Sequence, residues 1–213
     1  MDLHEYWKQR GKKFDVELEK QSSYVKSIMR NQEKNVLKIL RKNRWKKILE
    51  IGCGSGRLTK LIAELPDIEK FVAMDISPDL IESAKKNTRG QNIDYHCIDL
   101  QNYNPKEKFD LVFSCEVMMH IPHQEIKNII SNIISFSKQK IILAEFFDPE
   151  KIGSSLGGYC FVHDYKKIFE NIGVKRVHIH MINLPISIKL VNKYAKIRGR
   201  KELSKQAIIE VDV

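Results

Sequence analysis

The sequence predicts an α/β fold in which a parallel sheet is covered by helices on both faces. Short apolar runs of strand length alternate with segments of helical periodicity through most of the 213 residues. Strands that alternate with helices in this way build βαβ units. A glycine-rich turn joins the first strand to the helix after it, which is a place where such folds bind ligands. The length suits one domain with its own core.

The elements of this pattern follow one another from residue 24 onward. Residues 24–42 carry apolar side chains at helical spacing and predict an amphipathic helix. Ser77 has the features of an N-cap, with Pro78 at the first helical position. Isoleucines recur on one face of residues 124–136, which predicts another helix. Further helices are expected at 58–65, 78–87 and 163–171, and strands at 47–51, 70–75, 93–98, 109–114, 140–146, 174–182 and 205–211.

The composition excludes several classes of protein. With 42% hydrophobic and 30% charged residues, the chain is neither a disordered tail nor a membrane protein. No run of about 18 apolar residues is available for a transmembrane helix. The first residues lack the apolar stretch of a secretory signal, so a cytoplasmic location is expected. The four cysteines are widely spaced, so neither a disulfide framework nor a metal site is expected.

The net charge of +10 is concentrated near the two ends of the chain. Residues 1–47 carry +8 and residues 189–213 carry +4, whereas residues 48–188 carry −2. A basic balance is typical of proteins that bind nucleic acid or an anionic surface. A coding bias toward Lys also produces it, because 28 of the 37 basic residues are Lys and only 9 are Arg. Arg is the residue that grips phosphate with two hydrogen bonds, so both interpretations stay open.

The segment with the most chemical information is ILEIGCGSGR, residues 48–57. A buried strand runs directly into Gly52, Gly54 and Gly56, and glycines let a backbone turn sharply and approach a ligand. The helix that follows favours the polar or anionic end of a ligand at its N-terminus. A dinucleotide fingerprint would need glycine where Arg57 stands, and the Gly-Lys-Ser/Thr of a P-loop is missing. Both of those nucleotide-binding classes are therefore disfavoured.

Three acidic residues stand where ligand contacts are expected. Glu50 lies two residues before the first glycine, Asp75 ends the second strand, and Asp99 follows the third. Because the carboxyl ends of parallel strands meet at one edge of a sheet, these carboxylates and the glycine loop should converge. A carboxylate at the end of the second strand suits the two hydroxyls of a ribose. The ligand is expected to have the size of a nucleoside with a charged tail.

With this spacing the sequence resembles the class I S-adenosylmethionine-dependent methyltransferases over about residues 46–146. ILEIGCGSG resembles the first motif of that family, VAMDIS the second, YHCIDLQNY the third and FDLVFSCEVMMHIP the fourth. The resemblance implies a Rossmann-like, doubly wound sheet of seven strands in the order 3-2-1-4-5-7-6. That sheet would be mostly parallel, with an antiparallel last strand.

The resemblance also implies S-adenosylmethionine as cofactor and a set of residues that bind it. Asp75 would hold the ribose, and Asp99 would accept a hydrogen bond from the adenine amino group. Related enzymes cover the cofactor with an N-terminal segment, so Arg10 would pair with its carboxylate. The expected cofactor-binding residues are Arg10, Glu50, Gly52, Cys53, Gly54, Gly56, Asp75, Ile76, Asp99, Leu100, Ser114 and Cys115.

One domain over residues 1–213 is expected, in four consecutive parts. Residues 1–45 would form a helical cap, 46–182 the Rossmann-like core, 183–204 a helical insert and 205–213 the last strand. The insert is longer than a hairpin needs and carries a stripe of basic side chains beside an apolar face. It is either a lid that meets an anionic acceptor or lipid surface, or a solvated helix.

Methyl transfer requires an acceptor held in line and, for an alcohol or phenol, a base. His120 in the fourth motif and His163 after a Gly- and Ser-rich loop are the candidate catalytic residues. Helix capping or packing is the competing interpretation of each, with Asp164 as a cap beside His163.

The fourth motif lacks the Asn/Asp-Pro-Pro-Tyr/Phe of exocyclic-amine methyltransferases. A small or medium-sized acceptor methylated at oxygen is therefore expected. The basic flanks favour an anionic one, such as a phosphorylated sugar or a lipid precursor. The alternatives are an RNA or protein methyltransferase, and a non-catalytic protein that binds S-adenosylmethionine.

Overall fold

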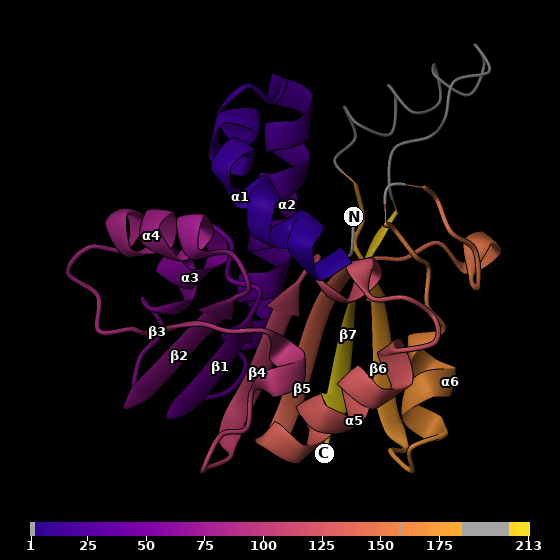
Figure 1. Ribbon diagram of the computed structural model, residues 1–213. Helices are drawn as coiled ribbons and strands as arrows, with labels where there is room; N and C mark the ends of the chain where they lie inside the picture. Colours follow the sequence, from indigo (N-terminus) through magenta and orange to yellow (C-terminus); the bar gives the residue numbers. More distant parts are fainter. Residues whose placement is uncertain (1–2, 158, 185–204) are drawn as a thin grey trace.

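A computed structural model describes residues 3–157, 159–184 and 205–213, and these form a seven-stranded sheet covered by helices on both faces (Figure 1). The strand order is β3-β2-β1-β4-β5-β7-β6, with only β7 antiparallel to its neighbours. This confirms the predicted topology. The strands are β1 (Lys47–Ile51), β2 (Lys70–Asp75), β3 (Asp94–Cys97), β4 (Phe109–Cys115), β5 (Ser137–Phe146), β6 (Arg176–Met181) and β7 (Gln206–Asp212).

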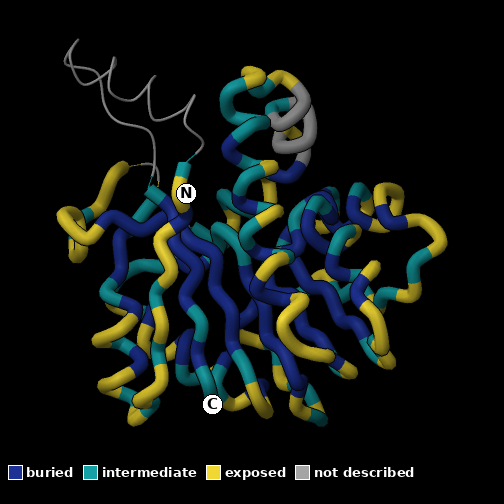
Figure 2. Tube along the Cα trace, turned by 180° about the vertical axis from the view of Figure 1, so that it is seen from behind, coloured by how far each residue is buried: buried dark blue, intermediate teal, exposed yellow. Residues whose placement is uncertain are grey.

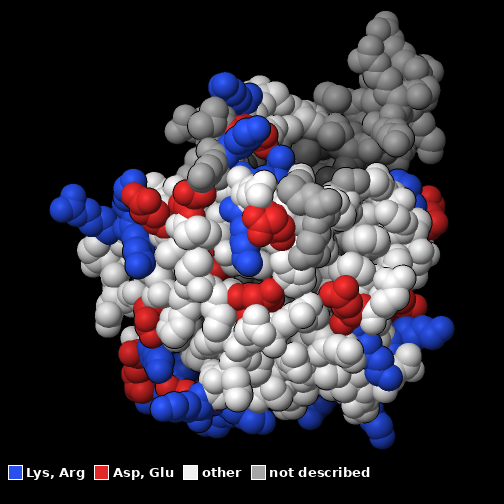
Figure 3. Space-filling model, in the orientation of Figure 1, with Lys and Arg blue, Asp and Glu red and all other residues white. Residues whose placement is uncertain are grey.

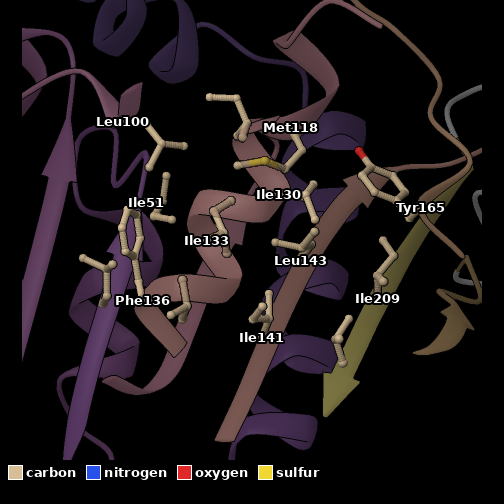
Figure 4. Packing of buried hydrophobic residues seen from close by; sticks show 14 of the residues in the cluster. Ile51, Leu100, Met118, Ile130, Ile133, Phe136, Ile141, Leu143, Tyr165 and Ile209 are labelled. Carbon is tan, nitrogen blue, oxygen red and sulfur yellow. The ribbon is translucent and has the colours of Figure 1, made fainter. Parts of the chain in front are cut away.

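Helices cover the sheet because successive residues of each buried strand point to opposite faces. Leu49 of β1 packs in a cluster with α5 and α6, whereas its neighbour Ile48 packs with α2, α3 and α4. Figure 4 shows part of the first cluster, and Figure 2 shows the buried strands between the two layers. The helices are α1 (Leu3–Glu19), α2 (Ser23–Leu40), α3 (Arg57–Ile62), α4 (Pro78–Asn87), α5 (Ile126–Phe136) and α6 (Tyr165–Glu170), with short 3₁₀ helices η1 (Leu100–Asn102), η2 (Met118–His120) and η3 (Pro149–Lys151).

Local capping signals account for several of the helix boundaries. The Ser77 side chain accepts a hydrogen bond from the Leu80 N–H at the start of α4, as its N-cap pattern predicts. Asp164 accepts one from the Lys167 N–H and so caps α6. The expected capping role of Asp164 is therefore confirmed.

The N-terminal region and β5 differ from the predicted elements. Residues 3–40 form two helices rather than one, and Ser22 caps the second by accepting from the Val25 N–H. The first helix, α1, was not expected from periodicity. β5 begins at Ser137, three residues earlier than predicted, and its pairing with β4 shifts register near Phe109. Residues 185–204, most of the expected insert, lie outside the described residues.

The helices α1 and α2 rise above the edge at which β1 and β4 end (Figure 1). The last turns of α2 are fastened to the sheet by Trp45, which is buried and donates its Nε1 hydrogen to the Leu40 carbonyl at 2.8 Å. No helix among the described residues is long and apolar enough to cross a membrane.

Ile133 on α5 is fully buried in the cluster of Figure 4, so Ile133→Ala should destabilise the fold. Removing three buried carbons and leaving a cavity should lower the free energy of unfolding by about 2–5 kcal/mol. Denaturant unfolding measures this directly. Asn132→Ala, at the neighbouring exposed position, is the control and should change stability by no more than about 0.5 kcal/mol. Equal effects of both changes would contradict the packing described.

Candidate functional site

A cavity of about 390 Å³ lies where the carboxyl ends of the strands meet the N-terminal helices. Its walls come from the glycine loop, the ends of β1, β2, β4 and β5, the start of β7, and α1 and α2. Ten of the twelve expected cofactor-binding residues line it. Gly56, at the end of the glycine loop, and Ser114, within β4, do not line it. The ten are Arg10, Glu50, Gly52, Cys53, Gly54, Asp75, Ile76, Asp99, Leu100 and Cys115.

The three glycines of the loop have positive φ angles, each for a different reason. At Gly52 a Cβ would lie 2.2 Å from Cγ2 of Val117. The turn packs so closely against the segment after β4 that a side chain has no room there. At Gly56 it would lie 3.1 Å from Cα of Ala84, where the loop touches α4. At Gly54 it would meet nothing within 4 Å, and this residue lines the cavity. The backbone at Gly54 is therefore open to a ligand.

Asp75 holds the glycine loop and the start of α4 at fixed positions. Its Oδ2 accepts the Gly54 N–H and its Oδ1 accepts the Ser77 N–H, both at 2.9 Å. Burial raises the pKa of this carboxyl, and the backbone N–H groups act in the opposite direction. Each carboxylate oxygen retains a second lone pair that can accept from a ligand in the cavity.

Glu50 brings an incompletely satisfied carboxyl group to the same cavity. The residue is 2% exposed, and burial raises its pKa to about 8. Its Oε2 has no partner within hydrogen-bond distance among the described residues, although the nearby Thr59 hydroxyl and Arg57 act to lower the pKa. A buried carboxylate oxygen without a partner is costly, so this wall of the cavity fits a cationic or hydrogen-bond-donating ligand group.

Asp99 lies at the far end of the cavity, where α1 crosses over it. Its Oδ1 accepts the Gln101 N–H, which starts η1, and its Oδ2 is 2.5 Å from Nδ1 of His4. The N-terminal helix is thus attached to the residue that was expected to meet adenine. No local sequence pattern indicates this contact, because the two residues are 95 positions apart.

Polar side chains from α2, β7 and the end of β4 meet at the opposite end. Oε1 of Glu116 accepts from Gln32 at 3.1 Å and from Gln206 at 2.8 Å. Gln206 is 5% exposed, and its own Oε1 has no partner among the described residues. Arg57, which disfavoured a dinucleotide fingerprint, donates to Gln32 and to Glu33. Gln32 and Gln206 were not recognised in the sequence.

His120 lines the cavity, and its contacts determine which ring nitrogen carries the hydrogen. Its Nδ1 lies 2.8 Å from the Tyr159 carbonyl oxygen, which can only accept, so Nδ1 carries the hydrogen. Burial lowers the pKa of the ring and favours the neutral form. In that form Nε2 holds a free lone pair. The indole of Trp7 packs on the imidazole with ring centres 4.2 Å apart.

His163 lies behind this wall rather than in it. It is 1% exposed, does not line the cavity, and donates from Nε2 to the Met118 carbonyl at 3.1 Å. Its Nδ1 faces Nδ1 of His123 at 3.2 Å. Burial lowers its pKa to about 4. Of the two candidate bases, the structure brings only His120 to the cavity.

Arg10 reaches the cavity from α1 but is already paired. Its guanidinium donates to Glu17 at 2.6 Å and lies 5.8 Å from the centre of the Tyr6 ring. Among the described residues, no group of three or more His, Cys, Asp or Glu side chains could hold a metal ion.

Comparisons with known proteins agree on one class. A family model described as a methyltransferase domain matches residues 48–140. The malonyl-[acyl-carrier protein] O-methyltransferase of Acetivibrio thermocellus is 37% identical over 67 residues, which is 32% of this chain and 24% of that protein. Phosphoethanolamine N-methyltransferase 3 of Arabidopsis thaliana is 25% identical over 137 residues, covering 62% and 28%. The chain thus matches only about a quarter of the length of these curated relatives.

Solved structures extend the likeness to the whole chain. Magnesium protoporphyrin IX methyltransferase from Synechocystis PCC 6803 with bound SAM superposes with a TM-score of 0.71 at 17% identity, covering 100% of this chain and 97% of that one. N-methyltransferase NodS from Bradyrhizobium japonicum WM9, in complex with S-adenosyl-L-homocysteine, gives 0.73 at 15% identity, covering 100% and 98%. The chain therefore has the class I S-adenosylmethionine-dependent methyltransferase fold. Within this fold, residues 48–140 match the model of a methyltransferase domain.

The raised pKa of Glu50 predicts how stability depends on pH. When a carboxyl has a higher pKa in the folded than in the unfolded state, ionising it costs more in the folded protein. The free energy of unfolding therefore falls as pH rises from about 4.5 to 8. Glu50→Gln removes this loss, so the variant should gain stability relative to wild type as pH rises, by up to about 1.4 kcal/mol per pH unit. Denaturant unfolding at pH 5 and pH 8 measures the difference. A difference that does not change with pH would contradict the burial of an ionisable Glu50.

Proposed function

We propose that this chain is an S-adenosylmethionine-dependent methyltransferase that methylates an oxygen atom of a small or medium-sized acceptor. The observation that carries the proposal is the meeting of three features in one cavity: the open backbone at Gly54, the Asp75 carboxylate and the unpartnered oxygen of Glu50. The methyltransferase domain match and the neighbours with bound SAM or S-adenosylhomocysteine support the same cofactor.

The residues around the cavity fit that cofactor group by group. Glu50 would face its cationic methionine end, which carries an ammonium and a sulfonium, because a buried carboxylate oxygen there lacks a partner. The remaining lone pairs of Asp75 would accept from the two ribose hydroxyls. Ile76 and Leu100 would pack on the adenine, with Asp99 beside it, where His4 already occupies one carboxylate oxygen.

When bound, the cofactor supplies an activated methyl group, and this chain has to place and deprotonate the acceptor. Nε2 of His120 is the atom that would take the proton from an acceptor hydroxyl. Its lone pair is available because the Tyr159 carbonyl holds the hydrogen on Nδ1. His163 has no part in this proton transfer, since both its nitrogens face other protein groups away from the cavity.

The polar atoms at this end of the cavity favour an acceptor group that donates a hydrogen bond. The Glu116 carboxylate and Nε2 of His120, from two residues that line the cavity, both accept hydrogen bonds. A hydroxyl satisfies such a set, whereas a carboxylate would be repelled by Glu116. An anionic part of the acceptor, such as a phosphate of a sugar or lipid precursor, would instead lie at the mouth. Figure 3 shows several Lys and Arg side chains on the part of the face formed by α1 and α2.

A methyl group added at Gly54 tests the cofactor site. The added methyl of Gly54→Ala would project into the cavity, so the affinity for S-adenosylmethionine should fall at least about tenfold. The thermal shift measured as a function of cofactor concentration gives this affinity. Gly90→Ala is the matched control: Gly90 also has a positive φ and open space around it, but does not line the cavity. Its backbone strain should be similar while cofactor binding stays intact. Full binding by Gly54→Ala would contradict the proposed position of the cofactor.

Cofactor binding should release a proton from Glu50. The cationic end of the cofactor stabilises the ionised carboxylate, so a pKa of about 8 in the empty protein falls on binding. At pH 7 about one proton should appear, and affinity should rise with pH up to that value. Calorimetry in buffers of different ionisation enthalpy counts the protons. The same release from Glu50→Gln would show that another group supplies the proton.

A further inference from the structure

The short helix η2 carries His120, and side chains from elsewhere in the chain satisfy its backbone. Glu145 of β5 is fully buried beneath it. Oε1 of Glu145 accepts the Val117 N–H at 3.3 Å and the Met118 N–H at 3.2 Å, and Oε2 accepts the Met119 N–H at 3.2 Å. These are the free backbone donors at the start of a helix, where a negative charge is also favoured. One carboxylate therefore fixes the whole first turn.

The carbonyl groups of η2 are held from the opposite side by residues 159–163. His163 donates from Nε2 to the Met118 carbonyl at 3.1 Å, and the Phe161 N–H donates to the Met119 carbonyl at 2.7 Å. The same segment accepts from Nδ1 of His120 through the Tyr159 carbonyl. The segment that orients the His120 ring is thus attached to the helix that carries it.

The hydrogen bonds also determine which nitrogen of His163 is protonated. A carbonyl can only accept, so Nε2 of His163 carries the hydrogen and Nδ1 of the neutral ring accepts from Nδ1 of His123. A charged His163 would place its Nδ1 hydrogen against the Nδ1 hydrogen of His123, so that two donors would face each other at that contact. The neutral ring is the form that fits, and burial favours it.

We propose that Glu145 and His163 are positioning residues that hold η2 from its two sides and keep Nε2 of His120 unprotonated and directed to the cavity. The proposal rests on the proposed function for what His120 does with its lone pair, but not for how it is held. A free imidazole exchanges between its two tautomers, whereas one tied to the Tyr159 carbonyl keeps a single form. Glu145, which sequence reasoning did not single out, would act entirely through His120.

The first test uses the wild-type protein and needs no acceptor. Nitrogen-15 spectra of the imidazoles should show His120 as a neutral ring with its hydrogen on Nδ1. Couplings across the hydrogen bonds should connect the amide nitrogens of Met118 and Met119 to the side-chain carboxyl carbon of Glu145. A His120 ring with its hydrogen on Nε2, or absence of both couplings, would overturn the proposal.

The second test removes each support separately. In Glu145→Gln an NH₂ group replaces one accepting oxygen and faces the N–H donors, so the single tautomer of His120 should be lost. Cofactor affinity should change by less than about threefold, since Glu145 does not line the cavity. Glu210→Gln is the control, being the same chemical change in the same sheet at a residue paired with Lys140. It should leave His120 unchanged.

Variants of His163 separate positioning from general stability. His163→Phe keeps a ring but loses the donor to the Met118 carbonyl, so the tautomer of His120 should become mixed. His163→Gln retains an N–H donor and should restore it. If Glu145→Gln and His163→Phe lower the melting temperature but leave the tautomer of His120 unchanged, both residues are only structural. That result would overturn the proposal. Absent cofactor binding with the expected His120 spectrum would instead count against the proposed function alone.

Discussion

Parallel strands leave backbone N–H groups without partners where the chain turns away from the carboxyl edge of the sheet, and side-chain carboxylates accept hydrogen bonds from them here. Asp75 accepts from Gly54 and Ser77, which start the turns after β1 and β2. Asp99 does the same after β3, and Glu145 serves three N–H groups after β4. The cavity exists because these turns stand apart at fixed positions. The glycine loop and the η2 turn that carries His120 are both held in this way.

The sequence was sufficient for the features that depend on local pattern. Alternating strand and helix periods predicted the sheet, the Ser77 cap is a four-residue signal, and the motif spacing led to the strand order. What it missed depends on residues far apart in the chain meeting in space. Glu145 stands out in IILAEFF as one acid within an apolar strand, and that signal could have been noticed. Its partners, 26–28 residues earlier, could not.

Two groups stand out among the basic residues behind the net charge of +10, those paired within the sheet and those on the N-terminal helices. Within the sheet, several basic residues form ion pairs with neighbouring acids. Lys140 pairs with Glu210 and Asp212, and Lys47 and Lys70 both pair with Glu107. The partly exposed pairs of Lys47 and Lys70 add little stability, and neither they nor the more buried Lys140 pairs carry information about a ligand. The basic residues of α1 and α2 are different, because these two helices stand over the cavity. Charge therefore bears on what approaches the mouth, not on methyl transfer itself.

Two deeply buried glutamates near the carboxyl edge of the sheet, Glu50 and Glu145, have different roles. One lines the cavity and the other supports a backbone turn. Burial raises the pKa of both Glu50 and Glu145 to about 8, and an ionised carboxylate in such a place costs several kcal/mol unless hydrogen bonds offset it. Both oxygens of Glu145 accept from backbone N–H groups, and the residue does not line the cavity. Glu50 lines the cavity, and its buried Oε2 has no partner within hydrogen-bond distance among the described residues. That oxygen is where a bound cation would contribute most, since it would relieve a cost the fold already bears.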